Sequence, residues 1–478
     1  MDKKKILKIG LIGIIGISIS AIGLFYVSDD FNREVKLAAI EQMGNVASQR
    51  MSASHSHEGD ATTSVAAEFI NIPIAAQEIA PGIFQATGVG NTHLITTENS
   101  HILFDTGLSL QVPKQIKALE AATEKKPLTH IIVSHSHADH LGGVKFWQRD
   151  ETKIITHTDF QEEQRYLTEL NPYFYGRNRL LFPFMPEKPP TLELLQYGGV
   201  RTDIAVADFE TYRFEEGGRI FEVIGTPGAE GADNIVLWLP EEKILFSGDV
   251  FGPIFPQFPN VFTMRGEKIR KPVEYLKTLK LIMALDPDVI VPSHREVVRD
   301  KTFIRAGLQK MHDAVSYVHD ETVNGMNAGK TLHQLMAEIK LPAELALSQE
   351  HGKVSWAVKS IWEYYATWFH FDKTSELYAV PDTAIYPDLV ALSGHQALND
   401  RIAAYLDEGK VFEAMHLLEI AQADKTNLQA WLHTQKLHKK TLSILLQQAE
   451  EGDKNSYEIY WLKSQIRLVN AVLSENNQ

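Results

Sequence analysis

The chain contains 478 residues and no cysteine. Disulfide bonds, thiolate metal sites and cysteine nucleophiles are therefore excluded, so any metal site has to be built from His, Asp and Glu. Positive charge is also scarce, because 47 Lys and Arg stand against 61 Asp and Glu, which gives a formal net charge of −14. A surface this acidic is a poor partner for phosphate backbones, and we expect no nucleic-acid partner.

What remains is the composition of a soluble globular protein, with 44% hydrophobic and 23% charged residues. The length exceeds what one ordinary hydrophobic core accommodates, so two folded domains are expected. From residue 72 onward, short apolar runs alternate with helical stretches, as in a layered α/β domain.

The amino terminus departs from this soluble pattern. Four lysines, the last at position 8, precede the uncharged apolar stretch 9–27. The stretch is nearly long enough to cross a bilayer, so residues 1–28 are predicted to be a signal anchor that holds the catalytic domain outside the cytoplasm, in the periplasm at the inner membrane. The alternative is a cleaved signal peptide and a secreted protein. The polar, aperiodic residues 29–70 are interpreted as a linker.

The strongest chemical signal is a dense group of potential metal ligands. It consists of His135, His137, Asp139 and His140, which directly follow the apolar run 131–133. A buried strand that ends here would place them in a tight loop. Imidazoles and carboxylates suit Zn²⁺, and alternate residues of such a loop can face two neighbouring ions.

This run resembles the His-x-His-x-Asp-His signature of the metallo-β-lactamase superfamily, and Asp105-Thr106-Gly107 fits the Asp-x-Gly that the family places after a strand pair. The resemblance implies an α/β fold, an αββα sandwich, which we expect over residues 71–322. Asp105 would then orient metal ligands without being one, although an Asp that opens a turn before Gly107 explains it equally well.

Four further strands are expected at 221–224, 235–239, 244–246 and 289–291. Each precedes or flanks a polar residue that can reach a common sheet edge, namely Glu230, Asp249 and His294. The superfamily usually has a His shortly after Thr-Pro-Gly, whereas Thr226-Pro227-Gly228 is followed by Glu230, with no His before Asp249.

A Glu in that place is similar to the alkylsulfatases of this fold, the SDS hydrolases. The separations 249 − 230 = 19 and 294 − 249 = 45 agree with that family. The resemblance implies two Zn²⁺ ions. One would be held by His135, His137 and Glu230, the other by Asp139, His140 and His294. Asp249 would bridge them, where the family usually has Glu.

The resemblance also implies substrate residues. Segment 262–266 looks like the family's Tyr-Thr-Leu-Arg-Gly, so Arg265 and Asn260 are expected to bind sulfate oxygens, beside the catalytic Asp139. Tyr175, in an aromatic stretch, is expected to hydrogen-bond the bound group. A surface ion pair for Arg265 and simple packing for Tyr175 remain open. The loop 252–259 lacks the histidines expected there, which leaves the general acid unidentified.

Residues 351–369 resemble the "HGSVSHNVKAVYQRYLGWF" segment of the alkylsulfatase dimerisation domain. We therefore expect an all-helical, tetratricopeptide-like domain over residues 323–478 and a homodimer. The resemblance ends where family members continue into a sterol-carrier-like domain, whose absence from this sequence puts long-chain substrates in doubt.

The predicted function is zinc-dependent hydrolysis of organic (alkyl) sulfate monoesters to an alcohol and inorganic sulfate. Three alternatives stay open. One is a lactonase or β-lactamase-like hydrolase, which would use the same metal centre on a carbonyl group. The second is a membrane-anchored, partner-binding scaffold with a vestigial metal site. The third is a zinc-binding module without turnover.

Overall fold

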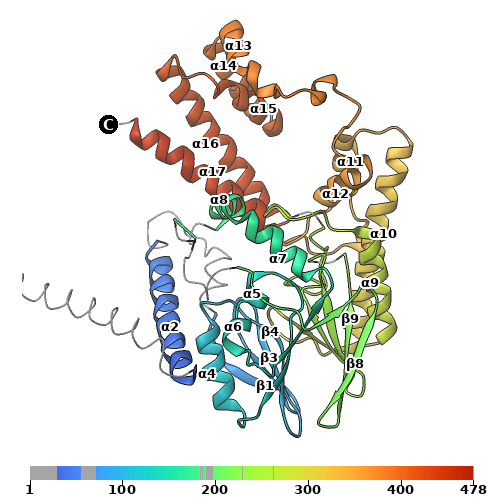
Figure 1. The fold of residues 1–478 in the computed structure, drawn as a ribbon. Helices are drawn as coiled ribbons and strands as arrows, with labels where there is room; N and C mark the ends of the chain where they lie inside the picture. Colours follow the sequence, from blue (N-terminus) through green and yellow to red (C-terminus); the bar gives the residue numbers. More distant parts are fainter. Residues whose placement is uncertain are drawn as a thin grey trace, which may run out of the picture.

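The computed structural model describes residues 29–54 and 72–476, apart from 183–184, 186, 190–196, 229 and 262. Two β-sheets lie face to face, and helices cover the outer side of each (Figure 1). A group of helices late in the chain, orange to red in Figure 1, stands over one end of this sandwich.

The first sheet has seven strands in the order β1 to β7. Strands β1 to β4 pair antiparallel, and β4 to β7 pair parallel. The parallel strands send their carboxyl ends to one edge, where residues from separate segments can meet. The bounds are β1 (Ala76–Ala80), β2 (Ile83–Ala86), β3 (Thr92–Thr96), β4 (His101–Thr106), β5 (Leu128–Ile132), β6 (Lys153–His157) and β7 (Ile204–Val206).

The second sheet has five strands in the order β12-β11-β10-β9-β8. Only β11 and β12 pair parallel. The four strands expected from apolar runs fall on β9 to β12, because every residue of β10 and β11 is buried between layers. The bounds are β8 (Thr211–Glu216), β9 (Arg219–Gly225), β10 (Ile235–Leu239), β11 (Ile244–Gly248) and β12 (Val289–Pro292).

Alternating side chains of the two sheets form a common core, with Ile102 and Phe104 of β4 against Phe246 of β11. The outer face of the first sheet packs on α4 and α6, and that of the second on α9 and α10. The expected αββα sandwich is confirmed. These helices are α4 (Val112–Ala122), α5 (Ala138–Leu141), α6 (Val144–Trp147), α7 (Phe160–Glu169), α8 (Asn171–Leu181), α9 (Pro272–Leu285) and α10 (Lys301–Asn327).

The carboxyl-terminal part is helical, as expected. Helices α11 and α12 pack on α10, whereas α14 to α17 form antiparallel pairs. The predicted boundary at residue 322 falls inside α10, whose buried face serves both the second sheet and α12. The bounds are α11 (Leu332–Glu338), α12 (Val354–Ala366), α13 (Tyr386–Ser393), α14 (His395–Asp407), α15 (Val411–Ala421), α16 (Leu428–Glu451) and α17 (Ser456–Glu475), with 3₁₀ turns at Ala343–Leu345, Thr374–Leu377 and Asp382–Ile385.

The amino-terminal region requires corrections. Within residues 29–54 and 72–476, no helix is both long and apolar enough to cross a membrane. The predicted anchor at 1–28 lies outside the described residues. Because no described helix supports a membrane span, the predicted transmembrane helix, the membrane partner and the periplasmic location are withdrawn. Residues expected to begin a linker form helix α2 (Asp29–Ser54), which buries Ile40 against the core around α4.

Candidate metal centre

The ligand motif lies where β5 ends, at the edge formed by the parallel strands. His135 is fully buried, His137 precedes α5, and that short helix carries Asp139 and His140. Asp249 directly follows β11 and His294 follows β12. The side chains therefore come from three strand ends that meet at one point between the sheets.

Six of the seven predicted ligands form two groups in the described part of the chain. His135, His137 and Asp249 make one, and Asp139, His140 and His294 make the other. Within each group the potential ligand atoms all lie within 4.8 Å of one another. The groups meet at Asp249, whose Oδ2 is 3.3 Å from His140 Nε2 and 3.0 Å from His294 Nε2. This is the place expected of a bridging carboxylate.

Neighbouring groups fix two of the imidazole rings. Asp105 accepts a hydrogen bond from His140 Nδ1 at 2.9 Å and also from the Ser134 backbone N–H at 2.7 Å. The Val89 carbonyl accepts from His294 Nδ1. Because the Nδ1–H of each ring donates a hydrogen bond to its acceptor, the Nε2 of each ring faces the cluster. Asp105 thus occupies the orienting position that was expected.

The donor set fits a divalent metal ion. Asp249 Oδ1 is buried without a hydrogen-bond partner among the described residues, and buried His140 Nε2 has only ion-pair contacts there, with Asp249 at 3.3 Å and Asp139 at 3.7 Å. Buried polar atoms rarely go without a partner, so atoms in this state point to a ligand. Burial lowers the pKa of His135, and although burial opposes ionisation of Asp249, His294 and His140 hold its pKa well below the usual range. Neutral imidazole and ionised carboxylate are the forms that coordinate metals, so His135 and Asp249 are ready to bind. Although burial opposes the shift, Asp249 raises the pKa of His140 and His294, so metal binding there would displace a proton.

Glu230 is not brought into either ligand group. Its carboxylate instead forms ion pairs with Arg270 at 2.6 Å and Arg265 at 3.2 Å. Both guanidinium groups offset the cost of burying this charge. Although burial acts in the opposite direction, Arg270, His351 and Arg265 together hold the pKa of Glu230 at about 2. In the described structure Glu230 therefore pairs with two arginines, and its role as a metal ligand beside His135 and His137 stays a prediction.

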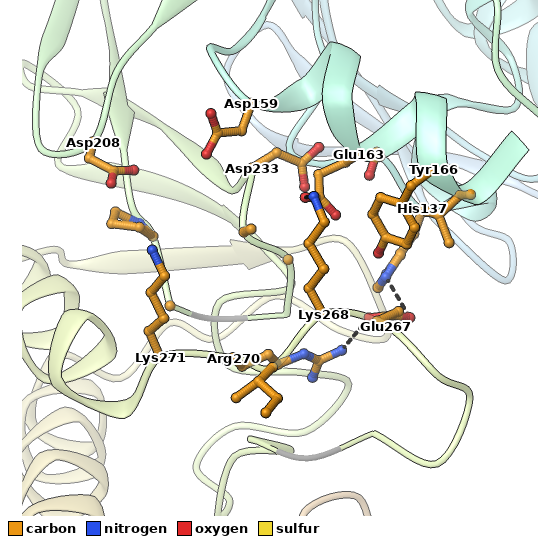
Figure 2. Close-up of a pocket in the computed structure, with 17 residues that line it drawn as sticks. His137, Asp159, Glu163, Tyr166, Asp208, Asp233, Glu267, Lys268, Arg270 and Lys271 are labelled. Carbon is orange, nitrogen blue, oxygen red and sulfur yellow. Dashed lines mark hydrogen bonds and ion pairs between the residues drawn. The ribbon is translucent and has the colours of Figure 1, made fainter. Parts of the chain in front are cut away.

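Glu267 occupies a position that sequence reasoning missed. Its Oε1 lies 3.1 Å from Nε2 of His137, and Figure 2 shows this contact at the edge of a pocket. The pocket is lined by charged side chains that include Lys268, Arg270 and Asp233. The available signal was weak: Glu267 lies two residues after Arg265 in a segment of alternating charge, a pattern that an exposed loop also shows.

The predicted substrate residues differ in their relation to the candidate site. Arg265 reaches the ligand groups through Glu267, which pairs with Arg265 at 3.2 Å and with His137 at 3.1 Å. The Nε of Arg265 and the Nδ2 of Asn260 are buried without a hydrogen-bond partner in the described chain, and donors in this state suit an anion. Tyr175 lies on α8, and its hydroxyl donates to the Lys188 carbonyl at 3.1 Å. The described contacts do not bring Tyr175 to the ligand groups.

The helical part of the chain reaches the site through two aromatic residues. Tyr457, at the start of α17, places its ring 5.9 Å from the Arg265 guanidinium carbon. His351, in the segment before α12, packs on Tyr457 with ring centroids 5.4 Å apart and lies 3.5 Å from Glu230 Oε1. The site is therefore bounded by both parts of the molecule.

Comparison with known proteins agrees with this division. Residues 86–294 match the metallo-beta-lactamase superfamily, and residues 331–460 match the alkyl sulfatase dimerisation family. The chain thus combines a metallo-β-lactamase domain with an alkylsulfatase dimerisation domain.

Two curated relatives carry sulfatase names. The chain is 29% identical over 323 residues to a linear primary-alkylsulfatase of Pseudomonas sp., covering 63% of this chain and 60% of that protein. It is 22% identical to an alkyl/aryl-sulfatase of Saccharomyces cerevisiae, covering 61% and 49%. The chain therefore spans only about half to three fifths of these relatives.

A solved structure shows the same fold. The stereoselective inverting sec-alkylsulfatase Pisa1 from Pseudomonas sp. matches with a TM-score of 0.69 and 21% identity, covering 84% of this chain and 66% of that one. At this identity the likeness extends to the fold alone. It includes the helical part, because the match covers more of the chain than the sandwich occupies.

Proposed function

We propose that this protein is a metal-dependent hydrolase that cleaves organic sulfate monoesters, with alkyl sulfates as the substrate class. The observation that carries the proposal is the position of Arg265. Its guanidinium pairs with Glu267, which also contacts the predicted ligand His137, and its Nε has no hydrogen-bond partner in the described chain. The sulfatase names of the curated relatives support the same substrate class.

We propose zinc as the metal and two ions as the number. His135, His137 and Asp249 would hold the first, and Asp139, His140 and His294 the second. A pair of bound ions supplies hydroxide near neutral pH and offsets the charge of an anionic substrate. Nitrogen and oxygen donors in two groups of three leave positions open for water and substrate, as catalytic zinc sites do.

The protein's own residues have separate tasks. Arg265 and Asn260 would orient the sulfate oxygens through their unpaired donors, which places the ester sulfur at the ligand groups. Arg270 holds Glu230, and that ion pair keeps Arg265 in place. The overall reaction adds one water across the ester, giving an alcohol and inorganic sulfate.

The dimeric state is also proposed. The second half of α12 and the residues after it expose a row of aromatic side chains, with Tyr365 44%, Trp368 71% and Phe371 88% exposed. A patch of this kind commonly marks a protein interface. The match of residues 331–460 to an alkyl sulfatase dimerisation family supports a second copy of the chain as the partner.

A hydrolysis panel tests the function. Zinc-loaded protein is assayed on alkyl sulfates, aryl sulfates, phosphate esters, lactones and a cephalosporin, and its metal content is measured in parallel. We expect two zinc equivalents and the highest kcat/KM on an alkyl sulfate. Arg265→Ala should lower kcat/KM for the sulfate about 10- to 100-fold, the worth of one charge-assisted contact. Faster hydrolysis of a lactone or the cephalosporin than of every sulfate ester would refute the substrate assignment.

A further inference from the structure

The imidazole of His137 has a partner at each of its nitrogens. Nδ1 lies 2.7 Å from His135 Nε2, on the side of the ligand groups. Nε2 lies 3.1 Å from Glu267 Oε1, at the edge of the pocket in Figure 2. A carboxylate accepts hydrogen bonds and cannot donate them, so the proton of this contact belongs to His137 Nε2. A neutral His137 then presents the lone pair of Nδ1 towards His135.

Glu267 is itself held in place. Its carboxylate forms ion pairs with Arg265 at 3.2 Å and with Arg270 at 3.0 Å. Two guanidinium groups on one carboxylate fix its position and favour its ionised form. Glu267 is therefore an acceptor held in place, which a single flexible surface contact would not provide.

The same arrangement occurs at two other histidines of the cluster. The Nδ1–H of His140 donates a hydrogen bond to Asp105, and the Nδ1–H of His294 donates one to the Val89 carbonyl. Each of these acceptors lies on the side of the ring that faces away from the cluster. At His137 the acceptor lies at Nε2, so here it is Nδ1 that is left to face the cluster.

We propose that Glu267 is a positioning residue that fixes the ring orientation and the Nε2–H tautomer of His137, so that Nδ1 is the atom offered to a divalent metal ion. The effect on metal binding rests on the proposed function, whereas the hydrogen bond between Glu267 and His137 does not depend on a metal. Histidine ligands commonly donate their second N–H to a carboxylate, and loss of that partner typically weakens metal binding 10- to 100-fold.

The test uses the full chain with Glu267→Ala and Glu267→Gln. Gln keeps the size and one acceptor oxygen, which guards against a folding defect in the Ala variant. The matched control is Glu163→Ala, because Glu163 lines the same pocket and pairs with Lys268. Zinc affinity is measured by competition with a chromophoric chelator. The tautomer of His137 is read by NMR of metal-free protein labelled with ¹⁵N-histidine, with the signal assigned from His137→Gln.

We expect the metal-free native protein to show His137 protonated at Nε2. Glu267→Ala should lose this tautomer preference and bind one of two zinc ions about 10- to 100-fold more weakly. Glu267→Gln should keep the tautomer with a smaller loss of affinity, and Glu163→Ala should match the native protein in both measurements.

An Nδ1–H tautomer in the native protein, or His137 signals unchanged in Glu267→Ala, would overturn the proposal whatever happens to metal affinity. The expected tautomer change together with native zinc affinity in Glu267→Ala would also overturn it, since the metal would not depend on the contact. If native protein binds no zinc but the tautomer responds as expected, the positioning role stands and the proposed function fails.

Discussion

Histidine 93 gives a quantitative prediction for stability against pH. His93 lies on β3 and is fully buried between the sheets, with its ring 5.5 Å from that of Phe246. Neither ring nitrogen has a hydrogen-bond partner in the described chain. Burial is the main cause of a lowered pKa, which falls from 6.5 to about 4, although Asp105 opposes the shift. The folded protein therefore resists protonation of this ring.

The sign follows from proton linkage. In the unfolded chain His93 binds a proton below pH 6.5, whereas in the folded protein it does so only near pH 4. The free energy of unfolding therefore falls as pH decreases from about 6.5 to about 4. A shift of this size corresponds to at most about 3 kcal/mol, and about 2 kcal/mol of it is already lost at pH 5.

The test is urea unfolding of native protein and His93→Leu from pH 7.5 to 5.0, with a chelator present to exclude metal effects. Leu is apolar and cannot titrate, so the native protein should lose about 2 kcal/mol more than the variant over this range. The effect of the substitution on packing is the same at each pH, so it cancels when only the pH dependence of the free energy of unfolding is compared. His416→Leu, at an exposed side chain of α15, is the control and should follow the native curve. Parallel curves for native protein and His93→Leu would refute the reasoning.

Three further predictions concern the site and the assembly. Glu230→Gln should retain both zinc ions by metal analysis but raise KM for an alkyl sulfate, because it weakens the ion pairs that place Arg265. Loss of one zinc ion in this variant would show that Glu230 is a metal ligand. Tyr457→Ala should also raise KM, about 2- to 30-fold for one lost cation–π contact, whereas Tyr457→Phe keeps the ring and should stay near native; equal effects of the two would refute a role for the ring. Trp368→Asp should shift the protein from dimer to monomer in sedimentation velocity at micromolar concentration, and an unchanged dimer would place the interface elsewhere.

The parts that were predictable from sequence depend on local patterns. Strands β10 and β12 are continuous apolar runs, and β9 and β11 are mostly apolar. The predicted ligands follow the ends of β5, β11 and β12. Once the strands are known, sheet geometry brings these ends together. The positions of Asp249 and His294 beside His140 follow from this logic without knowledge of the loops.

The parts that were missed depend on contacts between distant segments. The contacts of Glu230 with Arg270, forty positions later, and with His351 from the helical part could not be read from the sequence. Helix α2 was interpreted as a linker because its sequence has no strong amphipathic pattern, and its docking depends on Ile40 and Leu37 in the core and on a hydrogen bond from Arg33 to the Phe146 carbonyl. Tertiary contacts determine both the partners of Glu230 and the docking of α2, and such contacts cannot be predicted from residue spacing.

Helix α12 connects the exposed aromatic patch to the candidate site. Its first half buries Val354, Val358 and Ile361 in the core shared with α9 and α10, whereas beyond Tyr364 its side chains are exposed. His351, which lies beside Glu230, is only three residues before the helix begins. A second chain that covered the exposed end would restrict α12 along its length, because a helix anchored at both ends cannot tilt. The dimer would then limit movement of the segment that carries His351, although the exposed patch and His351 lie at opposite ends of that helix.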